Sequence, residues 1–332
     1  MRHRSISVST SRASSRAFAL AASLSLVTLG GLAACGTDSG AGDDDTSADA
    51  GTVDGDPPPP TSGFQIRTPD IEIGAGQEVT YCYYTTIDTT DAVGVKRWTS
   101  SMTPGSHHLI LYFTNDQQQP DGTLTQDCGV TGSGLNFPIW TYSAQSPENE
   151  ALMPDGVGMS VGAHQHAFVQ MHYLNTNPSA PITAHVSINA ETYEPGTSYQ
   201  RAAAYITYNT SINVPAGSTG SAQGTCAVPP DANFFLMSTH SHHFSTHTEV
   251  KDGAAMVLTS DDWEHPTVQE WDATPHYQFA SGSLTYHCDY NNTSTSPVRT
   301  GDSAETDEMC MAVGYFYPAT GPKLCLDSLV VQ

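Results

Sequence analysis

The chain has 332 residues, with 11 Lys and Arg against 34 Asp and Glu, and its formal net charge is −23. This excess of acid argues against nucleic-acid binding, because contacts to phosphates need clustered basic side chains. Charged residues are only 14% of the chain, which also has 28 Gly and 21 Pro, as is typical of a polar, loop-rich β protein. The 14 His outnumber the Lys and Arg, so metal binding is the first function to consider.

The N-terminus has the pattern of a bacterial lipoprotein signal. Basic residues precede an apolar stretch, Ala17–Ala34, which is too short and too rich in Ser and Gly for a membrane span. A small-residue cleavage site directly before Cys35 predicts that residues 1–34 are removed and that Cys35 carries the lipid. We therefore expect an exported protein held at the cell envelope, at the outer membrane, by acyl chains alone. An ordinary signal peptide with an incidental Cys is the alternative.

Residues 35–62 are expected to form a disordered tether. The segment holds seven Asp, no basic residue and one aliphatic side chain larger than Ala, Val53. Such a composition cannot offset the entropy of ordering. Pro57–Pro60 should stiffen its end as polyproline II.

Short strands are predicted throughout the rest of the chain. Alternating or β-branched runs between turn signals occur at Phe64–Ile73, Val79–Thr86, His107–Phe113, Ala167–Tyr173, Ile182–Ile188, Ala202–Ile212 and Ala312–Tyr317. Helical periodicity is absent, which indicates an all-β protein built from β-sandwiches. The polar, turn-rich segment Glu191–Gln200 predicts a boundary between domains at 63–200 and 201–332.

The cysteines indicate disulfides. Besides Cys35 there are six, at Cys82, Cys128, Cys226, Cys288, Cys310 and Cys325. An even number in an exported chain favours disulfides over free buried thiols, the alternative. The boundary near residue 200 leaves Cys82 and Cys128 together in the first domain, so these two should pair. The pairing of the other four stays open on this argument.

Two histidines open an apolar strand, at His107 and His108. Adjacent residues on a regular strand point to opposite faces, so both could bind one metal ion only at an irregular strand start. The turn residues Thr103–Ser106 would provide that irregularity. A His-His pair is weak evidence by itself.

Two further strands carry histidines with ligand-like spacing. Gln170 and His172 share one face of a strand, and His240 and His242 lie two apart on another. The second spacing suits a single metal ion. The alternative for Gln170 is an ordinary polar residue of a strand.

Two other motifs do not support catalysis. His243 and His247 lie four apart but lack the Glu of a zincin motif and a helical context. Residues Gly158–Gly162 match the G-x-S-x-G pattern, but this nucleophile elbow needs the strand–turn–helix of an α/β sheet. A serine hydrolase is therefore not expected.

Taken together, these segments resemble the copper type II, ascorbate-dependent monooxygenases, the family of peptidylglycine α-hydroxylating monooxygenase and dopamine β-monooxygenase. The resemblance runs in order from Thr80-Tyr81-Cys82 to Cys325. It is carried by Ser106–Tyr112, Gly156-Val157-Gly158, Val169–Tyr173, His240–His243 and Thr306-Asp307-Glu308-Met309-Cys310.

The resemblance implies two copper ions on two antiparallel, jelly-roll-like β-sandwich domains that face each other across a solvent cleft. The electron-transfer copper would be held by His107, His108 and His172, and the copper where O2 and substrate react by His240, His242 and Met309. A thioether favours Cu(I) and has little affinity for zinc, which agrees with this set. The family pattern also implies the disulfides Cys226–Cys325 and Cys288–Cys310, and Gln170 could orient a copper ligand.

The implied reaction converts a substrate C–H bond to C–OH, with one electron from each copper supplied by ascorbate or another one-electron reductant. Ser238 replaces the Arg that grips a peptide carboxylate in peptidylglycine enzymes, and Met311 and Val313 replace two polar substrate contacts. We therefore expect a monomeric enzyme for a neutral or cationic small molecule with an activated C–H bond. A non-catalytic copper-binding or copper-storing lipoprotein is the alternative.

Overall fold

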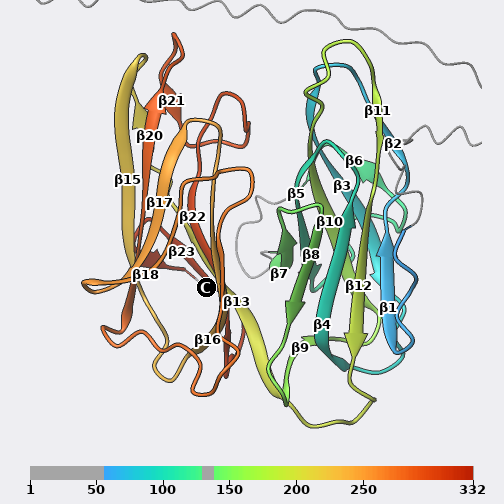
Figure 1. Cartoon of the computed structure of the whole chain (residues 1–332). Helices are drawn as coiled ribbons and strands as arrows, with labels where there is room; N and C mark the ends of the chain where they lie inside the picture. Colours follow the sequence, from blue (N-terminus) through green and yellow to red (C-terminus); the bar gives the residue numbers. More distant parts are fainter. Residues whose placement is uncertain (1–55, 129–137, 332) are drawn as a thin grey trace, which may run out of the picture. The chain divides into compact units, whose positions relative to one another are not determined.

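The computed structural model describes residues 56–128 and 138–331 (Figure 1). All regular elements in these ranges are strands, so the prediction of an all-β protein is confirmed. Within the same ranges, no helix has the length and apolar character needed to cross a membrane. The predicted signal peptide, the lipidation site Cys35 and most of the predicted tether lie outside the described residues.

The described residues before residue 200 form twelve strands. They are β1 Gly63–Arg67, β2 Ile71–Ile73, β3 Glu78–Ile87, β4 Val93–Met102, β5 Ser106–Thr114, β6 Leu124–Thr125, β7 Ile139–Ala144, β8 Glu148–Leu152, β9 Val157–Val161, β10 Gln165–Leu174, β11 Ile182–Ala184 and β12 Val186–Thr192.

Twelve more strands follow. They are β13 Gln200–Tyr208, β14 Asn213–Val214, β15 Ser218–Ala227, β16 Asn233–Ser241, β17 Ser245–Asp252, β18 Ala255–Ser260, β19 Val268–Glu270, β20 Ser283–Asn292, β21 Val298–Arg299, β22 Cys310–Tyr317, β23 Lys323–Leu326 and β24 Leu329–Val330.

An eleven-stranded sheet runs through both parts of the chain, in the order β1-β12-β4-β9-β13-β22-β16-β19, with β8, β23 and β24 paired at its side. Strand β13 makes the connection. Its Gln200–Ala202 pair in parallel with Val157–Met159 of β9, and its Ala203–Ile206 pair antiparallel with β22. The predicted boundary near residue 200 thus falls at the start of a strand that belongs to both parts of this sheet. The two domains and the solvent cleft stay predictions.

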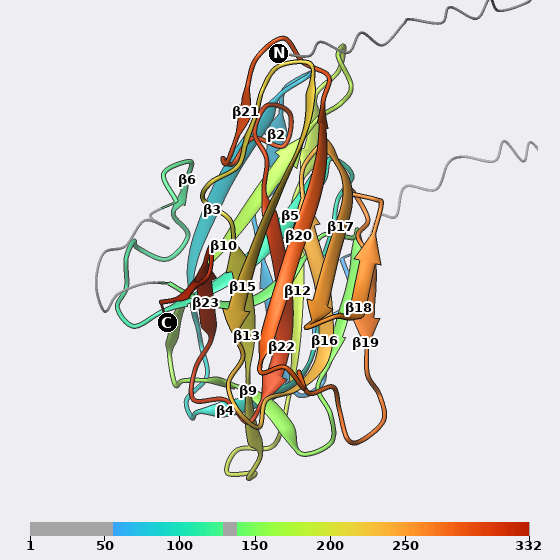
Figure 2. The same cartoon turned by 90° about the vertical axis from the view of Figure 1, so that its left-hand side faces the viewer.

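Two further sheets cover the large one and create the apolar cores. The five-stranded sheet β6-β3-β10-β5-β7 packs on the N-terminal strands, where Trp98 of β4 stacks on Tyr142 of β7 at 5.5 Å between ring centroids. The four-stranded sheet β15-β20-β17-β18 packs on β13, β16 and β22, and Figure 2 views the molecule from its side. Burial alternates along β20, as expected for a strand with one face on a core.

Three disulfides join neighbouring elements. Cys82–Cys128 ties β3 to the segment after β6, Cys226–Cys325 ties β15 to β23, and Cys288–Cys310 ties β20 to β22. The predicted boundary implied the pair Cys82–Cys128, and the family resemblance implied the other two pairs. The last one fixes the residue directly after Met309.

The prediction of a disordered tether is wrong for its last residues. The side chain of Gln65 donates a hydrogen bond of 2.7 Å to the Pro57 carbonyl, and that of Asn189 donates one of 3.0 Å to the Pro58 carbonyl. The Asp56 carboxylate accepts a bond of 2.6 Å from the Ser187 hydroxyl. A polyproline segment has no internal hydrogen bonds, so its carbonyls are free to accept bonds from β1 and β12.

Two predicted strands are interrupted. Phe64–Ile73 is divided into β1 and β2, because Pro69 lies between them and cannot donate to a sheet ladder. The run Ile182–Ile188 is likewise divided into β11 and β12 at His185. The backbone of His185 instead pairs with Thr103, whose hydroxyl accepts from the His185 N–H at 2.9 Å.

Candidate metal centre

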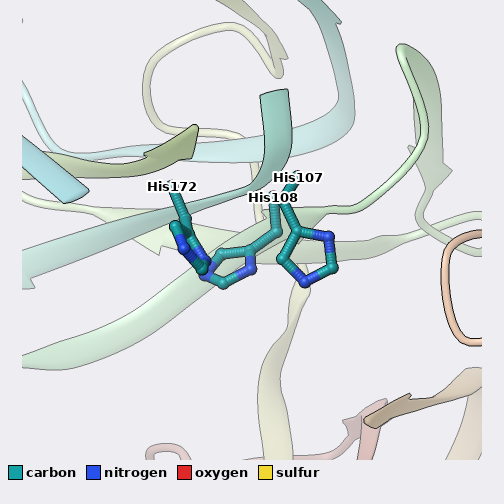
Figure 3. Close-up of side chains that lie close together, drawn as sticks. All are labelled: His107, His108 and His172. Carbon is teal, nitrogen blue, oxygen red and sulfur yellow. The ribbon is translucent and has the colours of Figure 1, made fainter. Parts of the chain in front are cut away.

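Three imidazoles come together at the start of β5 and the end of β10 (Figure 3). His172 faces His108 across the two strands, whereas the next residue, Tyr173, faces Ser106, so His107 is an extra, bulged residue. The turn before it contains Gly105 with φ of 88°, a conformation that favours glycine. A bulge re-aims a side chain. The irregular strand start that joint binding by two adjacent histidines requires is therefore present.

The ring centroids of this set lie 5.1–5.2 Å apart, for His107–His108, His107–His172 and His108–His172. One ring nitrogen from each lies within 4.8 Å of the others. His107 and His172 are buried and His108 is half-buried. This is the arrangement needed to hold one metal ion.

A second pair of imidazoles comes from the end of β16. His240 and His242 have ring centroids 5.2 Å apart. The fully buried carboxyl group of Glu308 accepts hydrogen bonds from the backbone N–H of His242 at 3.0 Å and of Phe244 at 2.6 Å. Burial raises the pKa of Glu308 to about 7, against the lowering effect of these bonds. Glu308 thereby fixes the chain turn that presents His242.

The two sets meet in one cluster. The ring of His107 lies 5.6 Å from that of His240 and 5.7 Å from that of His242, and His108 lies 5.2 Å from His240. Ring nitrogens of His107, His240 and His242 form a second group within 4.8 Å. The family resemblance implied two separate sites across a cleft. The structure instead brings all five imidazoles into contact, with His107 in both groups.

Hydrogen bonds to oxygen occupy one nitrogen on three of the rings. His172 Nε2 lies 2.9 Å from Glu78 Oε1, His240 Nδ1 lies 2.8 Å from Gln145 Oε1, and His242 Nδ1 lies 3.3 Å from the Asp307 carbonyl. Because these oxygens can only accept, we assign the ring proton to the nitrogen that faces each of them. The other nitrogen of each ring then has a lone pair directed elsewhere, as in metal-binding histidines.

Several of the remaining nitrogens are buried without a partner. Among the described residues, His107 Nε2, His108 Nδ1 and His242 Nε2 are inaccessible to solvent and make no hydrogen bond. An unpaired buried polar atom costs about 1–3 kcal/mol. A metal ion bound by these atoms would remove that cost, so the residues fit the copper that the family resemblance implies.

Four of the five imidazoles, those of His107, His108, His240 and His242, are neutral at neutral pH. Burial, together with the neighbouring rings, lowers the pKa of His107 to about 3 and that of His242 to about 4. The same causes hold the pKa of His108 and His240 well below its usual value. Neutral imidazole is the form that binds metal ions.

Met309 lies beside this cluster, directly before β22. It lines a cavity of about 660 Å³ together with His108, Gln170 and His240. Its backbone carbonyl accepts a hydrogen bond of 3.0 Å from the Tyr290 hydroxyl. The predicted ligand Met309 and the predicted positioning residue Gln170 therefore border the same space as one imidazole from each set.

Four residues near the cluster were not found from the sequence: Glu78, Gln145, Trp263 and Glu308. Glu308 could have been suspected from its position directly before the predicted ligand Met309. Glu78 begins β3, and Gln145 and Trp263 lie in loops, where polar or aromatic residues are ordinary. The ring of Trp263 lies 5.5 Å from that of His107.

The two motifs set aside earlier lie elsewhere. Ser160 is in strand β9, and its hydroxyl is 3.0 Å from the Tyr199 hydroxyl. His243 is exposed and packs on Trp263, while His247 of β17 pairs with Asp261 at 2.6 Å.

Residues 196–331 match the family model described as copper type II ascorbate-dependent monooxygenase, C-terminal domain. This match supports that family for the C-terminal part of the chain. The matched range contains His240, His242 and Met309 and begins just before β13. Members of the family depend on copper and ascorbate, and the match of the C-terminal part indicates a copper monooxygenase that uses O2, a substrate and a reductant.

A search of curated proteins finds no match for the chain. Among solved structures it is similar to the cowpea mosaic virus top component, with 10% identity over 82% of this chain and 96% of that chain and a TM-score of 0.33. It is also similar to BuGH86wt in complex with neoagarooctaose, with 10% identity over 70% of this chain and 35% of that chain and a TM-score of 0.19. These scores are too low to bear on fold or function.

Proposed function

We propose that the protein is a dicopper monooxygenase that hydroxylates an activated C–H bond of a small molecule. It would use O2 and an external one-electron reductant, either ascorbate or another donor. The observation that carries this proposal is the contact between the two histidine sets beside a cavity that Met309 also lines. The cavity favours catalysis over copper storage, because storage needs no space for a substrate.

His107, His108 and His172 would hold one copper ion, and His240, His242 and Met309 the other. Bound copper would supply the redox chemistry, in which one oxygen atom of O2 enters the substrate, the other leaves as water, and two electrons come from the reductant. The chain itself orients the rings through Glu78, Gln145 and the Asp307 carbonyl. It also keeps the imidazoles of His107 and His242 neutral by burying them.

The cavity wall supports a largely uncharged substrate. Most of its lining is apolar, including Leu109, Ile110, Tyr112, Trp140, Ile206, Leu236, Met311, Val313, Tyr315 and Leu324. The hydroxyl of Ser238 donates to the Thr267 carbonyl at 2.9 Å and so is already engaged. The described lining residues include one carboxylate, that of Asp302, and one amine, that of Lys323, so their charges balance. We propose a neutral or cationic small molecule as the substrate.

The decisive experiment is a single turnover. Copper-loaded protein would be reduced anaerobically and then mixed with isotopically heavy O2 and a panel of candidate substrates. Mass spectrometry should show a product that has gained one heavy oxygen atom. The His242→Ala variant is the control, because it lacks one predicted ligand of the copper that reacts with O2. Reduced protein that is reoxidised by O2 with no hydroxylated product from any candidate would count against catalysis.

We further propose that the protein is an exported, monomeric lipoprotein attached through Cys35. The support is the sequence pattern before Cys35 and the three disulfides, which form in oxidising compartments. Domains at 63–200 and 201–332 are part of the same proposal.

A further inference from the structure

Two side chains from the N-terminal part each bind one imidazole of the cluster and one loop of the C-terminal part. They are Glu78, at the start of β3, and Gln145, between β7 and β8. The loops are residues 261–267, between β18 and β19, and residues 300–309, between β21 and β22.

The carboxylate of Glu78 is shared by three donors. Its Oε1 accepts from His172 Nε2 at 2.9 Å and from the backbone N–H of Ala304 at 2.6 Å. Its Oε2 accepts from the Ser303 hydroxyl at 2.7 Å. Ser303 and Ala304 belong to the loop that leads to Met309. One rigid group thus binds an imidazole of the first set and the loop that carries a predicted ligand of the second.

The amide of Gln145 likewise binds one imidazole and one loop, but its imidazole, that of His240, belongs to the second histidine set. Its Oε1 accepts from His240 Nδ1 at 2.8 Å, and its Nε2 donates to the Trp263 carbonyl at 2.6 Å. The Trp263 ring in turn lies 5.5 Å from that of His107. An amide can accept from the imidazole and donate to a carbonyl at the same time, whereas a carboxylate has no donor.

We infer that Glu78 and Gln145 are positioning residues that couple the orientation of His172 and His240 to the seating of the two C-terminal loops on the N-terminal strands. When a loop moves away from the N-terminal strands, the Glu78 carboxylate or the Gln145 amide that is bonded to it is displaced. The imidazole that this side chain orients, His172 or His240, then becomes free to rotate. The inference relies on the proposed function only for the identity of the bound metal.

Hydrogen exchange of the apo chain tests the coupling without copper or activity. Glu78→Ala should raise amide exchange in residues 300–309, and Gln145→Ala in residues 261–267, by at least about tenfold. Glu78→Gln should stay near wild type, because its amide oxygen can still accept from His172 and Ala304. Exposed residues outside the cluster provide matched controls, Glu194→Ala and Gln223→Ala. Unchanged exchange in both loops for both cluster variants overturns the inference.

Spectroscopy of the Cu(II)-loaded chain tests whether loosening a loop also changes the orientation of the ring that is coupled to it. Gln145→Glu keeps the acceptor for His240 but cannot donate to Trp263, so it should raise exchange in residues 261–267 and, through the coupling, also alter the copper EPR spectrum. Ser303→Ala should likewise loosen residues 300–309 and alter the spectrum. Glu78→Ala and Gln145→Ala should change both. A spectrum that is the same in all four variants would show that neither side chain positions a ligand.

Discussion

The imidazole of His107 on β5 and that of His240 on β16 lie 5.6 Å apart between ring centroids. These residues belong to different histidine motifs, in different halves of the chain. Their contact turns two predicted ligand sets into one cluster in which His107 takes part in both groups of nitrogens. The expected consequences for metal binding differ from those of two isolated sites.

Copper titration should reflect this sharing. Wild-type protein should bind two copper ions per chain. His172→Ala and His242→Ala should each lose one, because each removes a ligand from one set only. His107→Ala should weaken both, since its nitrogens lie within 4.8 Å of both groups. Metal analysis after dialysis against a competing chelator measures this. A single copper in the wild type, or preferential zinc loading, would contradict the two-copper proposal.

Met309 should matter most for the reduced metal. A thioether is a soft ligand that favours Cu(I). Met309→Ala should lower the affinity for one Cu(I) by at least about tenfold, and that for Cu(II) by less. Competition with a Cu(I)-specific chelator gives the affinity. The control is Met311→Leu, which changes another methionine of the same cavity. Equal losses in the two variants would show that Met309 acts through packing alone.

The buried carboxylate of Asp252 should make stability depend on pH. Burial would raise its pKa, but bonds from the Ala280 and Ser281 backbone N–H groups, at 2.7 and 2.8 Å, and from Tyr277 outweigh that and lower it. A folded-state pKa below the unfolded value stabilises the protein above about pH 4, and this contribution is lost as the pH falls through the folded value.

Asp252→Asn should therefore reduce the free energy of unfolding by about 1–3 kcal/mol at pH 7 and by less at pH 3. Denaturant unfolding with the disulfides intact measures both values. A loss of the same size at the two pH values would mean that the charge of Asp252 is not involved.

Changing Cys35 to Ala should release the protein from the membrane fraction into the soluble exported fraction. Acyl chains on Cys35 are the proposed anchor, and membrane binding of this kind depends on buried lipid. Cell fractionation with an antibody provides the measurement. A variant that remains with the membranes would require another means of attachment.

Substrate preference should follow the apolar cavity. A peptide that ends in an amide should be hydroxylated at least as well as the same peptide with a free carboxylate, because Ser238, Met311 and Val313 offer no cation to hold the charge. Introducing one by Ser238→Arg should shift the preference towards the acid, since charge-assisted hydrogen bonds are worth about 1.5–3 kcal/mol.

Competition between the two peptides measures the ratio. If the wild type prefers the acid, Lys323→Met should abolish that preference, because Lys323 is the base found in the cavity wall.

Much of this architecture could be predicted because it is local. The apolar run at Leu109–Phe113 and the predicted strand at Ala167–Tyr173 lie in β5 and β10. The pairing Cys82–Cys128 followed from the division of the chain. Local patterns also misled, as where Pro69 divides a predicted strand and where Pro57 is held by Gln65.

The contact between His107 and His240 could not be predicted, because nothing local in either segment reports how the two parts pack. The same holds for Glu78 and Gln145. Each is an ordinary polar residue in its own segment and acquires its role from partners that lie far away in the sequence, such as Ser303 for Glu78 and His240 for Gln145.

The strand pairing of β13 limits how the histidine cluster can separate. Gln200–Ala202 are bonded to Val157–Met159 of β9, while the next four residues are bonded to β22, which follows Met309. Moving His240 away from His107 must therefore either bend a continuous sheet or break the short parallel pairing with β9. The sheet resists such a motion elastically over many strands, whereas rotation about a free linker would meet no such resistance. The resistance should fall most sharply once the three residue pairs between β13 and β9 are broken.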